Sequence, residues 1–380
     1  MRLRPKDDVS AVVLTLGEST ADEAIHCLAV QTRPLREVIV VKDTKPFHRA
    51  LNQGARLVQT PFFVQVDADM LLDPPCVARL RRGMRRDTGI VVAQLRDALI
   101  GRVVGVKLFR RACFSGAEFR DSVSPDTDFG AEIAAAGWKT VYVGKPRKLG
   151  GGAWKTYGEH RPSYTPEYTF RKYVLEGRRY RYRNSLGGIR WHFSRLEASR
   201  HPSAVVAQVA LAHGIFSDGE RNMLGRERGD EFELIERFLS GADRDGRPET
   251  RGPSRTFEPA RLALGGSATP RALDAPPREL FHRFYEIGVD LLLAGSVAAF
   301  MGYLAALGAT RRDDAAWISK IGICHGLCAG VAPDARNRID EEWLLLQEFL
   351  ATPAPEQAAQ VDGPRRFSRV IRGVRRSLVG

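Results

Sequence analysis

The stretch from Pro61 to Asp69, PFFVQVDAD, constrains the fold more than any other part of the chain. Its first residues are apolar and aromatic, which is typical of a strand buried on both faces of a parallel sheet. The strand ends in two carboxylates, Asp67 and Asp69, one residue apart. In an open α/β sheet the ligand lies just outside the carboxyl ends of the strands, so we expect both carboxylates at a binding site.

Two carboxylates at that edge would repel an anionic ligand unless a cation lay between them. A hard divalent ion, Mg²⁺ or Mn²⁺, that bridges an aspartate to a diphosphate removes the repulsion. We expect Asp69 to bind the metal directly, and Asp67 to contact a ribose or the water shell of the metal. Asp-x-Asp also occurs in surface turns, so the neighbouring segments have to decide between the two interpretations.

The segments around this strand alternate between strand-like and helix-like patterns. Strand, helix, strand, helix and strand in that order predict right-handed βαβ crossovers and a parallel sheet. The expected strands cover residues 9–16, 37–41, 61–66, 89–95, 103–109 and 139–143, and the expected helices cover 21–29, 47–58 and 129–136.

Composition fits a soluble globular protein, with 43% hydrophobic and 27% charged residues. The excess of 58 Lys and Arg over 45 Asp and Glu gives a formal charge of +13. This charge favours an anionic partner, although an arginine-rich background without function gives the same number. Five scattered cysteines without Cys-x-x-Cys spacing, and an N-terminus without a signal-peptide pattern, indicate a reducing, cytoplasmic location.

We divide the chain at changes in its hydrophobic pattern. The expected parts are a catalytic domain, a helical extension of it, a linker or long loop, a C-terminal helical region and a basic amphipathic tail, over residues 1–185, 186–240, 241–277, 278–352 and 353–380. A helix is also expected over residues 230–239 in the extension.

Two segments near the C-terminus raise the question of membrane contact. Residues 291–309 carry no charge and approach the length of a membrane span, but glycines and alanines dilute them, which favours a buried bundle helix. The tail has apolar residues at helical spacing among six arginines. It is either a helix lying on an anionic membrane surface or a solvated, disordered tail.

The order of elements and the residues at their ends resemble the GT-A fold of family 2 glycosyltransferases over roughly the first 185 residues. The matching pieces follow the family's order along the chain. They are the first strand, residues 27–32 with 37–43, residues 49–54, Asp67-Ala68-Asp69, and residues 126–128 followed by 137–143. Lys42 and Pro125 stand where the family usually has acids, and the Gln-x-x-Arg-Trp signature of processive synthases is missing.

The resemblance implies an α/β fold with a mostly parallel GT-A-type sheet flanked by helices. Beyond the matching residues, the sequence pattern predicts a C-terminal α-helical extension. It implies a metal-dependent, inverting transfer of a sugar from a nucleoside-diphosphate sugar to an acceptor hydroxyl, with Mg²⁺ or Mn²⁺ as the cofactor. The implied residues at the nucleotide-sugar are Thr15, Glu18, Asp43, Asn52, Asp67 and Ala68. The implied metal ligands are Asp69, Asp67 and His160, and the implied catalytic base is Asp126.

The required chemistry agrees with these residue types. A metal stabilises the leaving nucleoside diphosphate as a Lewis acid, and a single carboxylate deprotonates the acceptor. Asp126 and Asp128 also fit plain helix N-capping, worth about 1 kcal/mol each. We assign capping or a supporting contact to Asp128 and the role of base to Asp126. His160 is a lone histidine in a polar stretch, so a role outside the metal site is the competing interpretation.

Aromatic and basic residues alternate between Tyr157 and Arg183. Proteins that bind single-stranded nucleic acid use the same combination of residues. We prefer arginines that bind the donor diphosphate or an anionic acceptor, a glycan or a lipid-linked one, over nucleic acid. The tail would add peripheral contact at the inner face of the membrane. The rival hypotheses are a non-catalytic protein that binds polyanions or membrane surfaces on a degenerate transferase fold, and a sugar nucleotidyltransferase. The latter normally has a glycine- and lysine-rich loop after its first strand, unlike Gly17-Glu18-Ser19-Thr20.

Overall fold

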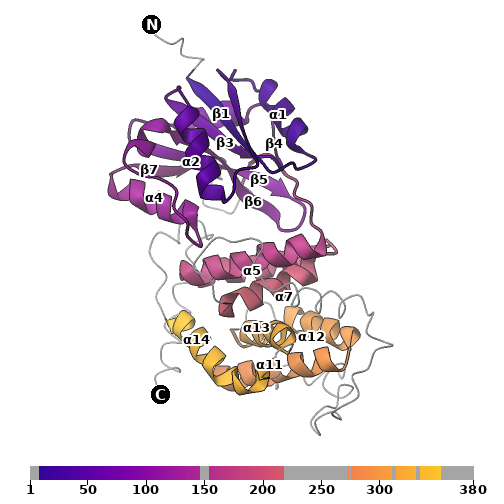
Figure 1. Ribbon diagram of the computed structural model, residues 1–380. Helices are drawn as coiled ribbons and strands as arrows, with labels where there is room; N and C mark the ends of the chain where they lie inside the picture. Colours follow the sequence, from indigo (N-terminus) through magenta and orange to yellow (C-terminus); the bar gives the residue numbers. More distant parts are fainter. Residues whose placement is uncertain are drawn as a thin grey trace. The chain divides into compact units, whose positions relative to one another are not determined.

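A computed structural model describes residues 8–145, 154–217, 273, 275–309, 314–330 and 334–351 (Figure 1). The chain divides into two compact units, the first extending to Ser163 and the second beginning at Tyr164. The described part of the first unit is an α/β sheet structure, and that of the second is helical.

The first unit alternates strands and helices through its first half and then adds antiparallel strands. In chain order its elements are β1 (Val9–Thr15), α1 (Ala21–Ala29), β2 (Val38–Lys42), α2 (Phe47–Leu57), β3 (Phe62–Asp67), β4 (Met70–Leu72), α3 (Cys76–Gly83), β5 (Thr88–Asp97), β6 (Gly101–Arg110), the 3₁₀ helix η1 (Arg111–Ser115), α4 (Pro125–Ala135), β7 (Lys139–Tyr142) and β8 (Thr156–His160).

These strands form one sheet in the order β2-β1-β3-β6-β5-β8-β4, and β7 also pairs with β5. Strand β1 is parallel to β2 and β3, as the βαβ pattern predicts. Strand β6 is antiparallel to β3 and β5, and β4 is antiparallel to β8, whereas β7 and β8 are parallel to β5. The α/β fold class is therefore confirmed. The short strands β4 and β8 were not expected from the sequence.

Helices cover both faces of this sheet because β1 and β3 bury side chains on both sides. On one face Val13 and Val66 pack with Leu28 of α1 and Leu80 of α3. On the other face Val12 belongs to a cluster that includes α2, α4 and six phenylalanines, namely Phe47, Phe63, Phe109, Phe114, Phe119 and Phe129. The sheet is thus the middle layer of three.

The described part of the second unit consists of helices. They are α5 (Pro166–Tyr182), α6 (Leu186–Glu197), α7 (Ala204–Phe216), α11 (Pro277–Leu293), α12 (Val297–Ala309), α13 (Asp314–Ala329), the 3₁₀ helix η3 (Ala335–Asn337) and α14 (Ile339–Ala351).

Helices α5 and α7 cross at a pair of glycines. A Cβ atom on Gly177 would overlap the carbonyl oxygen of Leu211, and one on Gly214 would overlap that of Val174. This close approach agrees with the place of α5 in the second compact unit, which begins at Tyr164. The domain boundary at residue 185 stays a prediction. The alternation of aromatic and basic residues in α5 does not indicate that this helix packs against α7.

Residues 291–309 do not form a single helix. Helix α11 ends at Leu293, and Gly295 adopts a φ of +60°, a left-handed conformation that favours glycine, before α12 begins at Val297. Phe300 is fully buried, whereas Leu293 is 66% exposed, so the expected buried helix is two helices of mixed exposure. Within the described ranges, no helix combines the length and the apolar character of a membrane span.

Several predicted segments lie outside the described residues. They are the helix over residues 230–239, nearly all of the linker over 241–277 and the basic tail over 353–380.

Helix α5 carries a carboxylate whose charge is stabilised by two arginines. Burial alone would raise the pKa of Glu176, but the guanidinium groups of Arg179 and Arg183 outweigh it and lower the pKa to about 2. The nearer contact joins Arg179 Nη1 to Glu176 Oε1 at 2.6 Å. A carboxyl group whose pKa is depressed on folding stabilises the protein above its ordinary pKa, and this contribution is lost as the pH falls towards 2.

Replacing Glu176 with glutamine is therefore expected to lower the free energy of unfolding by about 1.5–3 kcal/mol at pH 7. At pH 3 the loss is expected to be clearly smaller. Urea unfolding at the two pH values measures the difference. Glu167→Gln, on the same helix, is the control because Glu167 pairs with Arg171 at the surface, where ion pairs contribute about 0–1 kcal/mol. Equal losses at both pH values for Glu176→Gln would contradict the prediction.

Candidate active site

The sheet topology gathers the carboxyl ends of five strands at one edge. Strands β1, β2 and β3 run in parallel, β5 runs in the same direction because β6 is antiparallel to both β3 and β5, and β8 is parallel to β5. The last residues of these strands are Thr15, Lys42, Asp67, Asp97 and His160. This edge is where ligands bind in open α/β sheets.

Asp67 and Asp69 concentrate negative charge at this edge. Burial and the charges of Asp69 and Asp126 raise the pKa of Asp67, and Lys107 and a hydrogen bond from Gln65 offset part of this rise, so that the pKa is about 7. That bond runs from Gln65 Nε2 to Asp67 Oδ1 over 2.6 Å. The charge of Asp69 therefore opposes the ionisation of Asp67, and a bound cation would relieve the repulsion.

His160 is the last residue of β8 and faces Asp69. Its Nε2 lies 3.4 Å from Asp69 Oδ2, and the side chain is only 9% exposed. The backbone N–H of Arg161 donates to the carbonyl of Asp69 over 2.7 Å, which joins β8 to the Asp-x-Asp segment. Gly158 permits the approach of β8 to β4, because a Cβ atom there would overlap the carbonyl oxygen of Leu71.

The other nitrogen of the His160 ring contacts a second carboxylate. Nδ1 lies 2.7 Å from Oδ2 of Asp97, whose side chain is 1% exposed. Asp97 and His160 are opposite each other in the β5–β8 register, and Met70 of β4 is opposite His160 on its other side. Three strands thus fix the ring next to Asp69.

Asp126 belongs to the same cluster of charges. Its Oδ2 lies 2.6 Å from Lys107 Nζ, and its side chain is 44% exposed. Lys107 lies on β6 opposite Gln65 of β3, and the charges of Lys107 and Asp126 both act on Asp67. Helix α4 begins at Pro125 instead of Phe129, which places Asp126 in its first turn. Asp128, in the same turn, accepts a hydrogen bond from the Ser122 hydroxyl.

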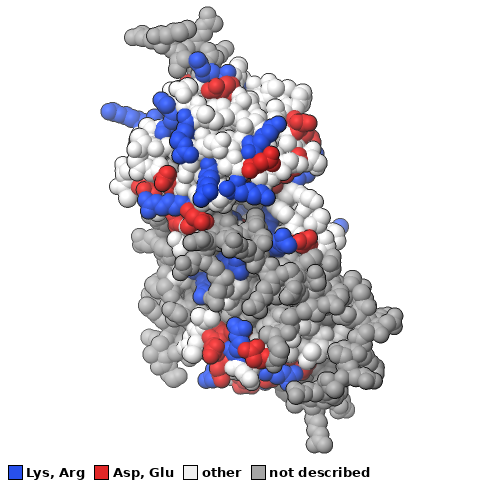
Figure 2. Space-filling view, in the orientation of Figure 1, with Lys and Arg blue, Asp and Glu red and all other residues white. Residues whose placement is uncertain are grey.

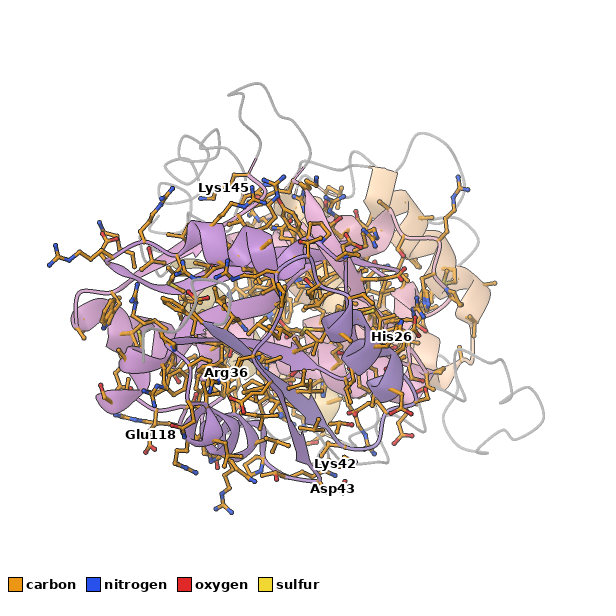
Figure 3. The ribbon with its side chains drawn as sticks, turned by 90° about the horizontal axis from the view of Figure 1, so that it is seen from above. His26, Arg36, Lys42, Asp43, Glu118 and Lys145 are labelled. Carbon is orange, nitrogen blue, oxygen red and sulfur yellow. The ribbon has the colours of Figure 1, made fainter. Side chains whose placement is uncertain are left out.

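Three other predicted residues lie at the ends of β1 and β2. Thr15 Oγ1 donates to Glu18 Oε2 over 2.7 Å, and this carboxylate also accepts from the Leu16 N–H, so Glu18 shapes the loop after β1. Asp43 follows β2 with a φ of 52°, and its N–H donates to the Thr15 carbonyl over 3.0 Å. Figure 3 shows Asp43 beside Lys42 at this end of β2.

Two predicted nucleotide-sugar residues make contacts that maintain the fold. Asn52 is buried, and its amide donates to the Phe119 carbonyl over 2.8 Å and accepts from the Phe119 N–H over 3.0 Å. The Ala68 N–H donates to the Leu14 carbonyl over 3.0 Å, and the Ala68 side chain is buried. The described contacts of both residues are therefore internal ones.

The sequence interpretation missed two residues of the cluster, Asp97 and Lys107. Asp97 follows an apolar strand just as Asp67 does, so the same pattern could have identified it. Lys107 is a charged residue inside an otherwise apolar stretch, VVGVKLF, which is a signal that it has a charged partner.

Asp69 offers the carboxylate that Mn²⁺ and Mg²⁺ sites use, and His160 offers an imidazole, a common ligand of transition-metal ions. The Asp69 carboxylate faces Nε2 of the His160 imidazole, and the second ring nitrogen, Nδ1, contacts the buried carboxylate of Asp97. A metal-binding histidine usually has such a contact at its other ring nitrogen. Within the part of the chain that the structure describes, no group of three or more His, Cys, Asp or Glu side chains is arranged to hold a metal ion. Mg²⁺-type ions at phosphate sites use one or two protein carboxylates and complete their shell with phosphates and water. The residues present fit a site of that kind.

Comparisons with known proteins found likeness only among solved structures, since no protein-family model and no curated protein sequence matches the chain. A mannosyltransferase from Pyrobaculum calidifontis in complex with GDP-Man and Mn²⁺ is 14% identical, with 55% of this chain and 73% of that chain covered and a TM-score of 0.37. TarS 1–349 of S. aureus in complex with UDP is 11% identical, with 88% of this chain and 91% of that chain covered and a TM-score of 0.33. The same protein in complex with UDP-GlcNAc is 12% identical, with 80% of this chain and 92% of that chain covered and a TM-score of 0.30. These scores are too low to assign a function or a site residue to this chain.

Proposed function

We propose that the chain is a metal-dependent, inverting glycosyltransferase that moves a sugar from a nucleoside-diphosphate sugar to an acceptor hydroxyl, in the assembly of a glycan or polysaccharide. The observation that supports it most is the charge cluster at the carboxyl edge of the sheet. There Asp69 faces His160, while Asp126 and Lys107 lie within electrostatic reach of Asp67. A cation site next to a separate carboxylate is what this reaction requires.

Asp69 and the Nε2 of His160 would hold Mg²⁺ or Mn²⁺. When bound, the ion would supply Lewis-acid stabilisation for the departing nucleoside diphosphate. Asp67 would contact the ribose or the water shell of the ion. Thr15, Glu18 and Asp43, at the ends of β1 and β2, would border the nucleotide, and their mutual hydrogen bonds would keep that border rigid.

Asp126 would accept the proton of the acceptor hydroxyl. Inversion needs one base, on the face of the sugar opposite the leaving diphosphate. The Lys107 ammonium, 2.6 Å from the Asp126 carboxylate, restricts the orientation of this carboxylate. The partial exposure of Asp126 leaves the carboxylate accessible to an acceptor.

On the face seen in Figure 2, the charge distribution favours a compact anionic substrate over a long polyanion. Figure 2 shows basic and acidic side chains interspersed over the visible face of the first unit instead of gathered in one basic stripe. Nucleic-acid-binding proteins typically cluster their basic residues on one face. The acceptor would be a glycan or a lipid-linked molecule in the cytoplasm, and the basic tail over residues 353–380 would bring the enzyme to an anionic membrane surface.

A thermal-shift screen of nucleoside diphosphates with and without Mn²⁺ tests the proposed function. We expect one nucleotide to raise the Tm only when Mn²⁺ is present, because ligand at 100 times its Kd stabilises the folded state by about 2.7 kcal/mol. The matching nucleotide-sugar should then release its nucleoside diphosphate in the presence of acceptor. No shift with any nucleotide would contradict the proposal, and tight nucleic-acid binding without turnover would favour the polyanion-binding alternative.

A further inference from the structure

We propose that Asp97 is a positioning residue for the metal site: its buried carboxylate selects the tautomer of His160 that directs an unprotonated Nε2 towards Asp69 and a divalent cation. This inference rests on the proposed metal-dependent function of the site. It adds a residue that does not contact the nucleotide-sugar and acts only through the histidine.

Two backbone N–H groups and the ring of His160 contact the Asp97 carboxylate. Oδ1 accepts hydrogen bonds from the backbone N–H groups of Leu99 and Ile100, each over 2.9 Å. Oδ2 lies 2.7 Å from His160 Nδ1, and the side chain is 1% exposed. The two backbone bonds shape the turn between β5 and β6, but they use only one oxygen. The second oxygen is directed at His160, and the turn does not need it.

The contact with Asp97 determines which ring nitrogen is left for a cation. A neutral imidazole carries one N–H, and an ionised carboxylate can only accept. In the neutral ring, the nitrogen that faces Asp97 therefore carries the proton, and Nε2 keeps its lone pair. Because Nε2 is the nitrogen 3.4 Å from Asp69 Oδ2, the lone pair and the Asp69 carboxylate face the same place. A histidine whose other nitrogen donates to a carboxylate is also a more basic ligand.

Replacing Asp97 with asparagine separates the two roles of this residue. The asparagine oxygen can still accept from Leu99 and Ile100, while its amide N–H group would donate to His160 Nδ1. That donation moves the ring proton to Nε2 and removes the lone pair. We expect the affinity of the full chain for Mn²⁺ alone, measured by electron paramagnetic resonance of the free ion, to fall by about 10–100-fold.

Asp73→Asn is the matched control. It makes the same change in charge at a carboxylate that pairs with Arg96, the residue next to Asp97, and so leaves His160 unaltered. Its Mn²⁺ affinity should equal that of the wild type. In a His160→Ala background, Asp97→Asn should cause no further loss, because the residue through which Asp97 acts is already gone.

The tautomer itself can be measured in the wild-type chain, without a variant that has to fold. Long-range proton–nitrogen spectra, assigned with His160→Ala and recorded where the ring is neutral, should show a proton on Nδ1 and none on Nε2. The inference is overturned by a proton on Nε2, by wild-type Mn²⁺ affinity in Asp97→Asn, by an equal loss in the His160→Ala background, or by a wild type that does not bind Mn²⁺. Mn²⁺ binding with these properties but without nucleotide-sugar turnover would leave the inference standing and refute the proposed function.

Discussion

Asp126→Asn is expected to lower kcat for sugar transfer by roughly 10²–10⁴-fold, the usual contribution of a positioned general base. Asparagine keeps the size of the side chain but cannot take the acceptor's proton. Mn²⁺-dependent stabilisation by the nucleoside diphosphate should persist, because Asp126 belongs to α4 and is paired with Lys107 instead of the metal residues. Release of the nucleoside diphosphate at saturating donor measures kcat, and thermal shift measures nucleotide binding.

Asp128→Asn is the matched control for this substitution. Asp128 lies in the same turn of α4, but its partner is the Ser122 hydroxyl. It should keep a kcat close to that of the wild type and lose at most about 1 kcal/mol of stability, as expected for a residue at a helix start. The assignment of the base is wrong if Asp126→Asn retains wild-type kcat or if both variants lose the same amount.

Asp69→Asn is expected to remove metal-dependent turnover. The substitution replaces the charged ligand that faces His160 Nε2 with a neutral amide, and the attraction between carboxylate and cation is lost. Mn²⁺ affinity should fall by at least about 10²-fold, since loss of a ligand exceeds the effect of losing a residue that merely supports one. The Mn²⁺-dependent rise in Tm with nucleoside diphosphate should disappear with it.

The same Mn²⁺ titration used for Asp97 checks this prediction, with Asp73→Asn again as the control for charge. Turnover that stays metal-dependent in Asp69→Asn would show that the cation is bound elsewhere. Unchanged binding of nucleic acid in this variant, together with absent turnover in the wild type, would instead favour the polyanion-binding alternative.

The first half of the α/β sheet could be predicted because its signals are local. Each of β1, β2 and β3 is an apolar run, and the helices between them have regular inward spacing, so the crossover rule supplies the topology. The Asp67 and Asp69 position follows from that topology alone. The start of α4 was misplaced because Pro125, which fits the first position of a helix, was interpreted as a departure from a family motif.

The rest depends on contacts between residues far apart in sequence. Strand β8 has the short polar sequence TYGEH, and only its pairing with β4 and β5 makes it a strand. The partner of His160 is set by register, which sequence spacing does not reveal. Likewise, the contact of Gly177 with α7 depends on Gly214, and nothing in either helix alone indicates that the two glycines meet.

Strand β5 has two neighbours on the same side. Its first half, from Thr88 to Val92, pairs with β7, which follows the helix that carries Asp126, and its second half, from Gln94 to Asp97, pairs with β8, which carries His160. The length and register of β5 therefore determine the distance between Asp126, the proposed proton acceptor, and His160, the proposed cation ligand. Inserting a single residue into β5 would change the distance between Asp126 and His160, although neither residue would itself be replaced.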